Sequence, residues 1–158
     1  MLEILLPDGS VRRFEHPVTV YKVAEDIGIG LARAALAADI DGELVDVSYS
    51  IKSDCSIRII TAKESEGLEV LRHSAAHLLA QSVKLLFPDA QVGIGPVIEN
   101  GFYYDFSYPP GFTEKDLGNI EAKMLELAES GQNIERFVED RESAIKRFIE
   151  IGETYKAE

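Results

Sequence analysis

Residues 2–14 read LEILLPDGSVRRF, a short apolar run followed by Asp8-Gly9 and then by a second run that contains Val11 and Phe14. An Asp-Gly pair between two extended runs is a strong short-range signal for a β-hairpin, because both residues tolerate the positive φ angles of a tight turn. This stretch therefore predicts two antiparallel strands, and the residues that follow must complete a sheet around them.

Two short helices are expected after this hairpin. Thr19 precedes a run with helical spacing of apolar residues, and its hydroxyl can accept a hydrogen bond from the free N–H groups at the start of a helix. Gly28 and Gly30 are suited to end that helix, because glycine adopts the conformations that follow a last helical turn without strain. A second short helix is expected at residues 31–35.

A second hairpin and a final strand follow. Asp41-Gly42 separates residues 36–40 from residues 43–45, which repeats the signal of the first hairpin. Residues 56–61, SIRIIT, alternate polar and apolar side chains before becoming apolar, as an inner strand does. A hairpin, a helix, a second hairpin and a strand within about 60 residues predict an α+β sheet crossed by one helix.

Composition limits the classes of protein to which the chain can belong. It has 158 residues, 46% of them hydrophobic, and no run approaches the ~18 apolar residues that span a bilayer. The start lacks a positively charged segment and meets Pro7 and Asp8 too early for a signal peptide, so a cytoplasmic location with no membrane partner is expected. Cys55 is the only cysteine, which excludes an intrachain disulfide and a multi-cysteine metal site.

The net charge of −12 bears on nucleic-acid binding. It argues against a protein held on nucleic acid mainly by neutralising phosphates, because such proteins show a basic patch or stripe. Acidic residues outnumber basic residues in both halves of the chain. Any RNA contact by this chain is therefore expected to be local.

A long helix is expected at residues 66–87, where apolar side chains recur at steps of three and four, and Pro88 should end it. Its leucines are expected to pack on a sheet, which would leave two histidines of the helix facing a cleft. The side that packs would carry Leu68, Leu71, Leu78 and Leu79.

The next stretch, residues 92–106, is rich in glycine and aromatic residues, and Asn100-Gly101 predicts a further hairpin within it. Its glycines lack the spacing of a phosphate-binding loop and are expected to allow tight bends instead. Residues 102–105 should alternate across a strand, with one face in the core and the other free to line a cleft. Phe102 is expected in the core, whereas this pattern leaves the place of Tyr104 open.

The remaining residues predict two helices with a short strand between them. Thr113 is placed as an N-cap, with Asp116 three residues later, for a helix that continues to about residue 130. A short strand is expected around residues 134–138, and a last helix at residues 140–151.

Two of the three histidines lie in the sequence RHSAAHL, residues 72–78. Residues four apart share one face of a helix, so the rings of His73 and His77 can reach a common point. Such a pair suits a metal site, an acid/base pair or a polar clamp on a substrate, and it also suits two exposed histidines on a structural helix. A zinc-protease motif is absent, because Ser74 stands where HExxH requires glutamate.

Longer segments bring a resemblance to known families. The segments LPDGS, VAEDIGIGLA, DGELVD and SIRIITAK resemble the TGS domain, a small ubiquitin-like module. The stretch from EGLEVLRHSAAHLL to GFYYDF resembles the start of the second N-terminal domain of bacterial threonyl-tRNA synthetases, and GETYK matches a further piece of it. The resemblance implies an α+β fold, with a β-grasp TGS domain at residues 1–62. Residues 63–158 would form an incomplete editing domain with a long helix and a short antiparallel sheet.

In that family the catalytic core joins threonine to tRNA with ATP, and the second N-terminal domain hydrolyses mischarged seryl-tRNA. Editing answers a physical need, because one methyl group in a pocket is worth only ~1–3 kcal/mol of discrimination. The resemblance implies a fragment that is inactive alone and uses no cofactor itself. The whole enzyme would use ATP, magnesium and a zinc ion in its core, bind tRNA and form a homodimer. Apolar surface on the incomplete domain would be left exposed.

The resemblance also implies site residues. His73 and His77 match the HxxxH editing motif, Lys156 matches a lysine of that site, and Tyr104 matches an aromatic position beside it. His73 would hold the terminal ribose hydroxyl or move a proton, while His77 would orient that hydroxyl or a water molecule. Lys156 would activate water or stabilise negative charge. The family site also uses a cysteine and a further histidine that this chain does not match.

Two alternatives remain open at this stage. TGS domains also serve as noncatalytic docking or regulatory modules in GTPases and stringent-response synthetases, which suits residues 1–62 but leaves HSAAH and GETYK unexplained. A small zinc hydrolase centred on His73 and His77 is the other alternative, and it would need at least one more ligand.

Overall fold

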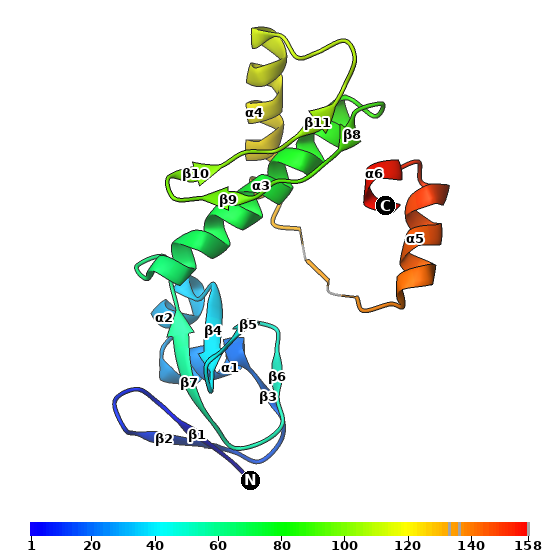
Figure 1. Ribbon diagram of the computed structural model, residues 1–158. Helices are drawn as coiled ribbons and strands as arrows, with labels where there is room; N and C mark the ends of the chain where they lie inside the picture. The colour runs from blue at the N-terminus through cyan, green and yellow to red at the C-terminus, as the bar shows by residue number, and fades with distance from the viewer. Residues whose placement is uncertain (133, 136, 158) are drawn as a thin grey trace. The chain divides into compact units, whose positions relative to one another are not determined.

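The computed structural model describes residues 1–132, 134–135 and 137–157, and the chain falls into two compact units, Met1–Leu71 and Arg72–Glu158 (Figure 1). The boundary lies inside the long helix α3, Ser65–Leu86. Both units combine helices with strands, so the predicted α+β class is confirmed. Among the described residues, no helix has the length and apolar character needed to cross a membrane.

The first unit is built on a five-stranded sheet in the order β2-β1-β7-β4-β5. The central strand β7 pairs in parallel with β1, where Ile4 faces Cys55, and antiparallel with β4 on its other side. Both predicted hairpins are present, and a small ladder that no pattern predicted joins β3 to β6. The strands are β1 Leu2–Leu5, β2 Val11–Phe14, β3 Val18–Thr19, β4 Ala37–Ile40, β5 Glu43–Asp46, β6 Ser50–Ile51 and β7 Cys55–Ile60.

The turn between β4 and β5 explains why Asp41-Gly42 was informative. Both residues have positive φ, 51° and 91°, as a two-residue hairpin turn requires. The side chain of Asp41 accepts hydrogen bonds from the backbone N–H of Ser56 at 2.9 Å and from its hydroxyl at 2.7 Å. These bonds lower the pKa of Asp41 and tie the turn to the start of β7.

Two helices cross the sheet, α1 Val20–Ile27 and α2 Ile29–Ala34. The Thr19 hydroxyl accepts a hydrogen bond from the N–H of Lys22 at 3.2 Å, which confirms the predicted N-cap. The apolar face of α1 packs on the sheet and forms an aliphatic core. Its buried members are Ile4, Leu6, Val18, Val20, Val23, Ala38, Ile51 and Ile57.

The connection from β7 into α3 is closely packed. A Cβ added to Gly67 would lie 1.8 Å from the carbonyl oxygen of Thr61, so only glycine fits there. The Arg58 guanidinium on β7 pairs with Glu66 at 2.9 Å and with Asp39 at 3.3 Å. The first turn of α3 is thereby tied to the inner strands β7 and β4.

In its described residues the second unit combines the rest of α3 with the helices α4, α5 and α6 and with two small ladders, β9 with β10 and β8 with β11. The Asn100-Gly101 hairpin is present, since Gly101 pairs with Ile98. Helix α3 ends at Leu86, ahead of Pro88, as predicted. The other elements are β8 Gln91–Val92, β9 Val97–Ile98, β10 Gly101–Phe102, β11 Phe106–Ser107, α4 Glu114–Glu129, α5 Arg141–Glu150 and α6 Thr154–Ala157.

The helix starts of this unit follow the sequence closely. Thr113 and Asp116 form a capping box at α4, and Asp140 caps α5 by accepting from the N–H of Ser143 at 3.0 Å. Helix α6 was not predicted. The strand expected around residues 134–138 includes residue 136, which lies outside the described residues. Its described residues are irregular, and Ile134 and Phe137 are 95% and 80% exposed.

The buried face of α3 differs from the predicted one. Leu68 and Leu71 are 42% and 40% exposed, so their predicted place against a sheet is wrong, while Leu78 and Leu79 are half-buried. The buried row is Ala76, Ala80 and Val83, because small side chains let neighbouring elements approach the helix closely. Around Val83 the core is largely aromatic. Its partly buried members are Leu79, Phe87, Phe106, Tyr108, Phe112 and Met124.

Candidate functional site

Two imidazoles lie together on the exposed side of α3. The Nε2 atoms of His73 and His77 are 2.9 Å apart, and the ring planes meet at 72° with their centroids 4.6 Å apart. Both residues are exposed, whereas Ala76 between them is buried. The expectation that both rings reach a common point therefore holds. One ring donates a proton to the other in this contact, so the pair can share or relay a proton.

The surroundings of His77 favour its neutral form. Partial burial lowers the pKa of His77, and the nearby His73 and Lys156 lower it further. A neutral imidazole has one nitrogen free to accept a proton at neutral pH, which is the property that a general base requires.

Lys156 lies on α6 and follows His77 by 79 residues in the sequence. It is exposed, and its ammonium lies 5.9 Å from the centre of the Phe148 ring. Its charge contributes to the lowered pKa of His77. His73 and His77 are thus in contact, and Lys156 lies near enough to act on the pKa of His77.

Tyr104 occupies a half-buried position that depends on a glycine. Its ring stacks on Phe106 with centroids 5.1 Å apart, and a Cβ added to Gly95 would lie 2.2 Å from the ring. Burial and then the nearby Glu153 raise the pKa of Tyr104, so its phenol stays protonated and can donate a hydrogen bond. Residues 103–105 are irregular rather than part of the predicted strand, although Tyr103 is exposed and Tyr104 half-buried, as alternation requires.

Two residues of this neighbourhood were missed by the reasoning from sequence. Lys84 and Glu153 form an ion pair at 2.7 Å, and Glu153 is only 7% exposed. A signal was available, because Glu153 belongs to GETYK and Lys84 stands seven residues after His77, which places it on the same helix face. The pairing itself joins residues 69 positions apart and could not be read from spacing.

The capacity of the region for a metal ion is small. Within residues 1–132, 134–135 and 137–157, no group of three or more His, Cys, Asp or Glu side chains is arranged to hold a metal ion. His73 and His77 would supply two ligands, whereas a zinc site uses at least three from the protein. The zinc-hydrolase alternative therefore lacks support from the described part of the chain.

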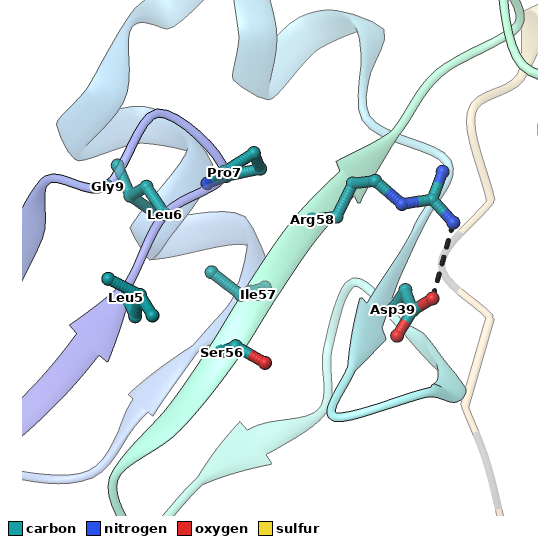
Figure 2. Close-up of a pocket in the computed structure, with 8 residues that line it drawn as sticks. All are labelled: Leu5, Leu6, Pro7, Gly9, Asp39, Ser56, Ile57 and Arg58. Carbon is teal, nitrogen blue, oxygen red and sulfur yellow. Dashed lines mark hydrogen bonds and ion pairs between the residues drawn. The ribbon is translucent and has the colours of Figure 1, made fainter.

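A separate hollow of about 410 Å³ lies in the first unit, between the β1–β2 turn and β7 (Figure 2). Figure 2 shows Arg58 at its edge, reaching toward Asp39 and paired with it. Because the guanidinium is also paired with Glu66, it is already neutralised and is a poor receptor for an anionic ligand. The hollow is lined by Leu5, Leu6, Pro7, Gly9, Asp39, Ser56, Ile57 and Arg58, and none of these is a predicted site residue.

Comparison with known proteins agrees with the resemblance seen in the sequence. Residues 2–61 match the TGS domain family, so the predicted β-grasp TGS domain is confirmed. The chain is 60% identical over 155 residues to the threonine–tRNA ligase of Nitrosococcus oceani, which covers 98% of this chain and 24% of that protein. It is 60% identical over 158 residues to the threonine–tRNA ligase of Alkalilimnicola ehrlichii, and 59% to that of Herminiimonas arsenicoxydans.

These matches extend over nearly the whole chain, so the similarity to threonine–tRNA ligases that the sequence predicted is confirmed. The chain spans about a quarter of the length of the curated relatives it matches.

Proposed function

We propose that this chain, a relative of threonine–tRNA ligases along its length, is the N-terminal part of such a ligase. The whole protein would join threonine to tRNA, as the name of its relatives states, and would use ATP to do so. Sequence identity of 58–60% in alignments that cover 98% of the chain supports this proposal. A core outside these 158 residues would use ATP, magnesium and zinc, and the whole protein would work as a homodimer in the cytoplasm.

Residues 72–157 would contribute to hydrolytic editing of seryl-tRNA. The observation that carries this proposal is the contact of His73 and His77 at 2.9 Å, with Lys156 close enough to act on the pKa of His77. Threonine and serine differ by one methyl group, which limits discrimination in a single pocket to about 10–200-fold. A second site that destroys the wrong ester raises the accuracy.

The reaction would be the hydrolysis of an ester. Water adds to the ester carbonyl, the bond between the acyl carbon and the ribose oxygen breaks, and the ribose oxygen takes up a proton. Neutral His77 suits the removal of a proton from water or from a ribose hydroxyl that it orients. His73, in contact with His77, would hold the neighbouring ribose hydroxyl or deliver a proton to the ribose oxygen that leaves the acyl carbon.

The other two predicted residues suit the stabilisation of charge. Negative charge develops on the carbonyl oxygen in the transition state, and a cation or a hydrogen-bond donor beside it lowers the barrier. The Lys156 ammonium and the protonated phenol of Tyr104 have the chemistry that this stabilisation requires. Lys156 would also serve to activate water, and Tyr104 to orient the bound substrate.

The test uses the whole ligase and preformed seryl-tRNA. We expect His73→Ala to slow hydrolysis by about 10²–10⁴-fold, the usual contribution of a positioned acid or base, and to leave threonylation of tRNA unchanged. His16→Ala is the matched control, because His16 is an exposed histidine in the first unit. Hydrolysis at the normal rate by the His73 variant would remove the histidine from the mechanism and with it the proposal for this site.

The two alternatives account for less of the chain. A TGS docking module corresponds to residues 2–61 only, whereas the identity with the ligases continues through residues 72–157. A zinc hydrolase needs a third ligand, and stoichiometric zinc in the purified chain is the observation that would revive it.

A further inference from the structure

Lys84 is anchored firmly on the helix that carries the two histidines. It follows His77 by seven residues, about two turns, so it lies on the same face of α3. Its ammonium contacts Glu153 Oε1 at 2.7 Å and donates to the carbonyl oxygens of Pro88 at 2.8 Å and Ala90 at 2.9 Å. All three of its protons thus have acceptors, and the ammonium cannot turn away without losing one of them.

Glu153 is the partner that depends most on this contact. It is 7% exposed, and a carboxylate buried to that extent is costly unless an opposite charge accompanies it. One oxygen meets Lys84, while Oε2 is buried without a hydrogen-bond partner within the described part of the chain. Lys84 is therefore the charged partner of the Glu153 side chain, while the N–H of Glu153 donates to the carbonyl oxygen of Phe148 at 2.9 Å.

The position of Glu153 controls the position of Lys156. The two are three residues apart, and the N–H of Lys156 donates to the carbonyl oxygen of Glu153 at 3.2 Å. Helix α6 has four residues, too few to be stable alone, so attachments to its surroundings decide where it lies. Besides the Lys84 contact, the N–H of Thr154 donates to the side chain of Gln91 at 3.3 Å.

We propose that Lys84 and Glu153 are a positioning pair that holds Lys156 beside His77. The proposal rests on the editing function proposed above and adds two residues to it. Neither member needs to touch the substrate. The pair acts by joining α6 to the same face of α3 that carries the histidines. The ammonium of Lys156, three residues after Glu153 on α6, is thereby kept near enough to act on His77.

The test is an NMR titration of the His77 ring in the 158-residue chain. The titratable and charged groups that act on His77 are His73 on α3 and Lys156 on α6. Lys156→Met should raise the pKa of His77, because it removes a nearby positive charge. Glu153→Gln should raise it in the same direction by releasing α6, and should cause no further change in the Lys156→Met background.

Glu126→Gln is the matched control, because Glu126 pairs with Lys123 at 2.7 Å on the exposed side of α4. It should leave the titration of His77 unaltered. If Glu153→Gln does not fold, Glu153→Asp keeps the charge but shortens the side chain, and should raise the pKa of His77 by a smaller amount.

An unchanged titration in the folded Glu153 variants, or an equal shift with and without Lys156, would overturn the proposal. Because the titration needs no substrate, it tests the positioning pair alone. The seryl-tRNA assay tests the editing function separately, so the failure of one can be told from the failure of the other.

Discussion

The two units of this chain are stabilised in different ways. The first has a continuous five-stranded sheet over an aliphatic core in which Ile4, Val20 and Val23 are completely buried. The second has ladders of two-residue strands and a helix, α5, without a buried residue. Its core around Val83 is largely aromatic, and α4 begins with a capping box. The comparison teaches that core changes in the continuous sheet of the first unit should be costly, whereas changes on the unburied helix α5 should cost little.

The largest expected effect is in the core of the first unit. Ile4→Ala should lower the free energy of unfolding of that unit by about 2–5 kcal/mol, because it removes a fully buried side chain and leaves a cavity. Ile149→Ala on α5 is the matched change, and since Ile149 is 60% exposed the loss should be within about 0.5 kcal/mol. Urea unfolding followed by amide NMR signals from each unit measures both, and equal losses would contradict the contrast.

A pair of glycines should give effects of opposite sign. Gly67→Ala would place a Cβ 1.8 Å from the Thr61 carbonyl oxygen, so the β7–α3 connection must shift and the first unit should lose about 1–3 kcal/mol. Gly118→Ala in α4 meets no atom within 4 Å and should stabilise the second unit by about 0.5–1 kcal/mol, since alanine is the better helix former. The same urea experiment reads both changes. Stabilisation by Gly67→Ala would show that the connection adapts freely.

The smallest expected effect concerns acid stability. The pKa of Glu66 is lowered from an ordinary 4.5 to about 2. The largest cause is a hydrogen bond from its own backbone N–H, followed by hydrogen bonds from the side chains of Arg58 and Ser65. A carboxyl with a lowered folded-state pKa stabilises the native state above its unfolded pKa, and this contribution is lost as the pH falls from about 4.5 through about 2.

Glu66→Gln should therefore reduce the steepness of acid unfolding of the first unit in that range, measured by amide NMR signals during an acid titration. Glu69→Gln, an exposed change one turn later on the same helix, is the control. An identical acid profile for the Glu66 variant would exclude this contribution.

Much of the fold could be predicted because its signals are local. Asp8-Gly9 and Asp41-Gly42 fix turns by their backbone preferences, Thr19, Thr113 and Asp140 cap helices within three residues, and Pro88 follows the end of one. The strands β3 and β6 could not be predicted, because two residues are too few to show a period. The leucines of α3 predict the wrong buried face, because the residues buried on this helix include the small Ala76 and Ala80, whereas Leu68 and Leu71 are exposed.

In the candidate site, too, some residues could be predicted from local spacing and others could not. The histidine pair follows from helical spacing alone, since residues four apart must share a face. The positions of Lys156 and Tyr104 followed from resemblance to a family, and no local rule would have joined them to the histidines. The role of Gly95 in making room for Tyr104 became visible only with the ring in place.

The sequence by itself determined the hairpins, the long helix and the side of it on which His73 and His77 lie, because those depend on residues within a few positions of one another. Only the tertiary structure decided that Lys84 meets Glu153 and that Lys156 comes close to His77. The physical reason is that residues 69 or 79 positions apart come together only through the packing of the elements between them. That packing cannot be read from a period or spacing in the sequence.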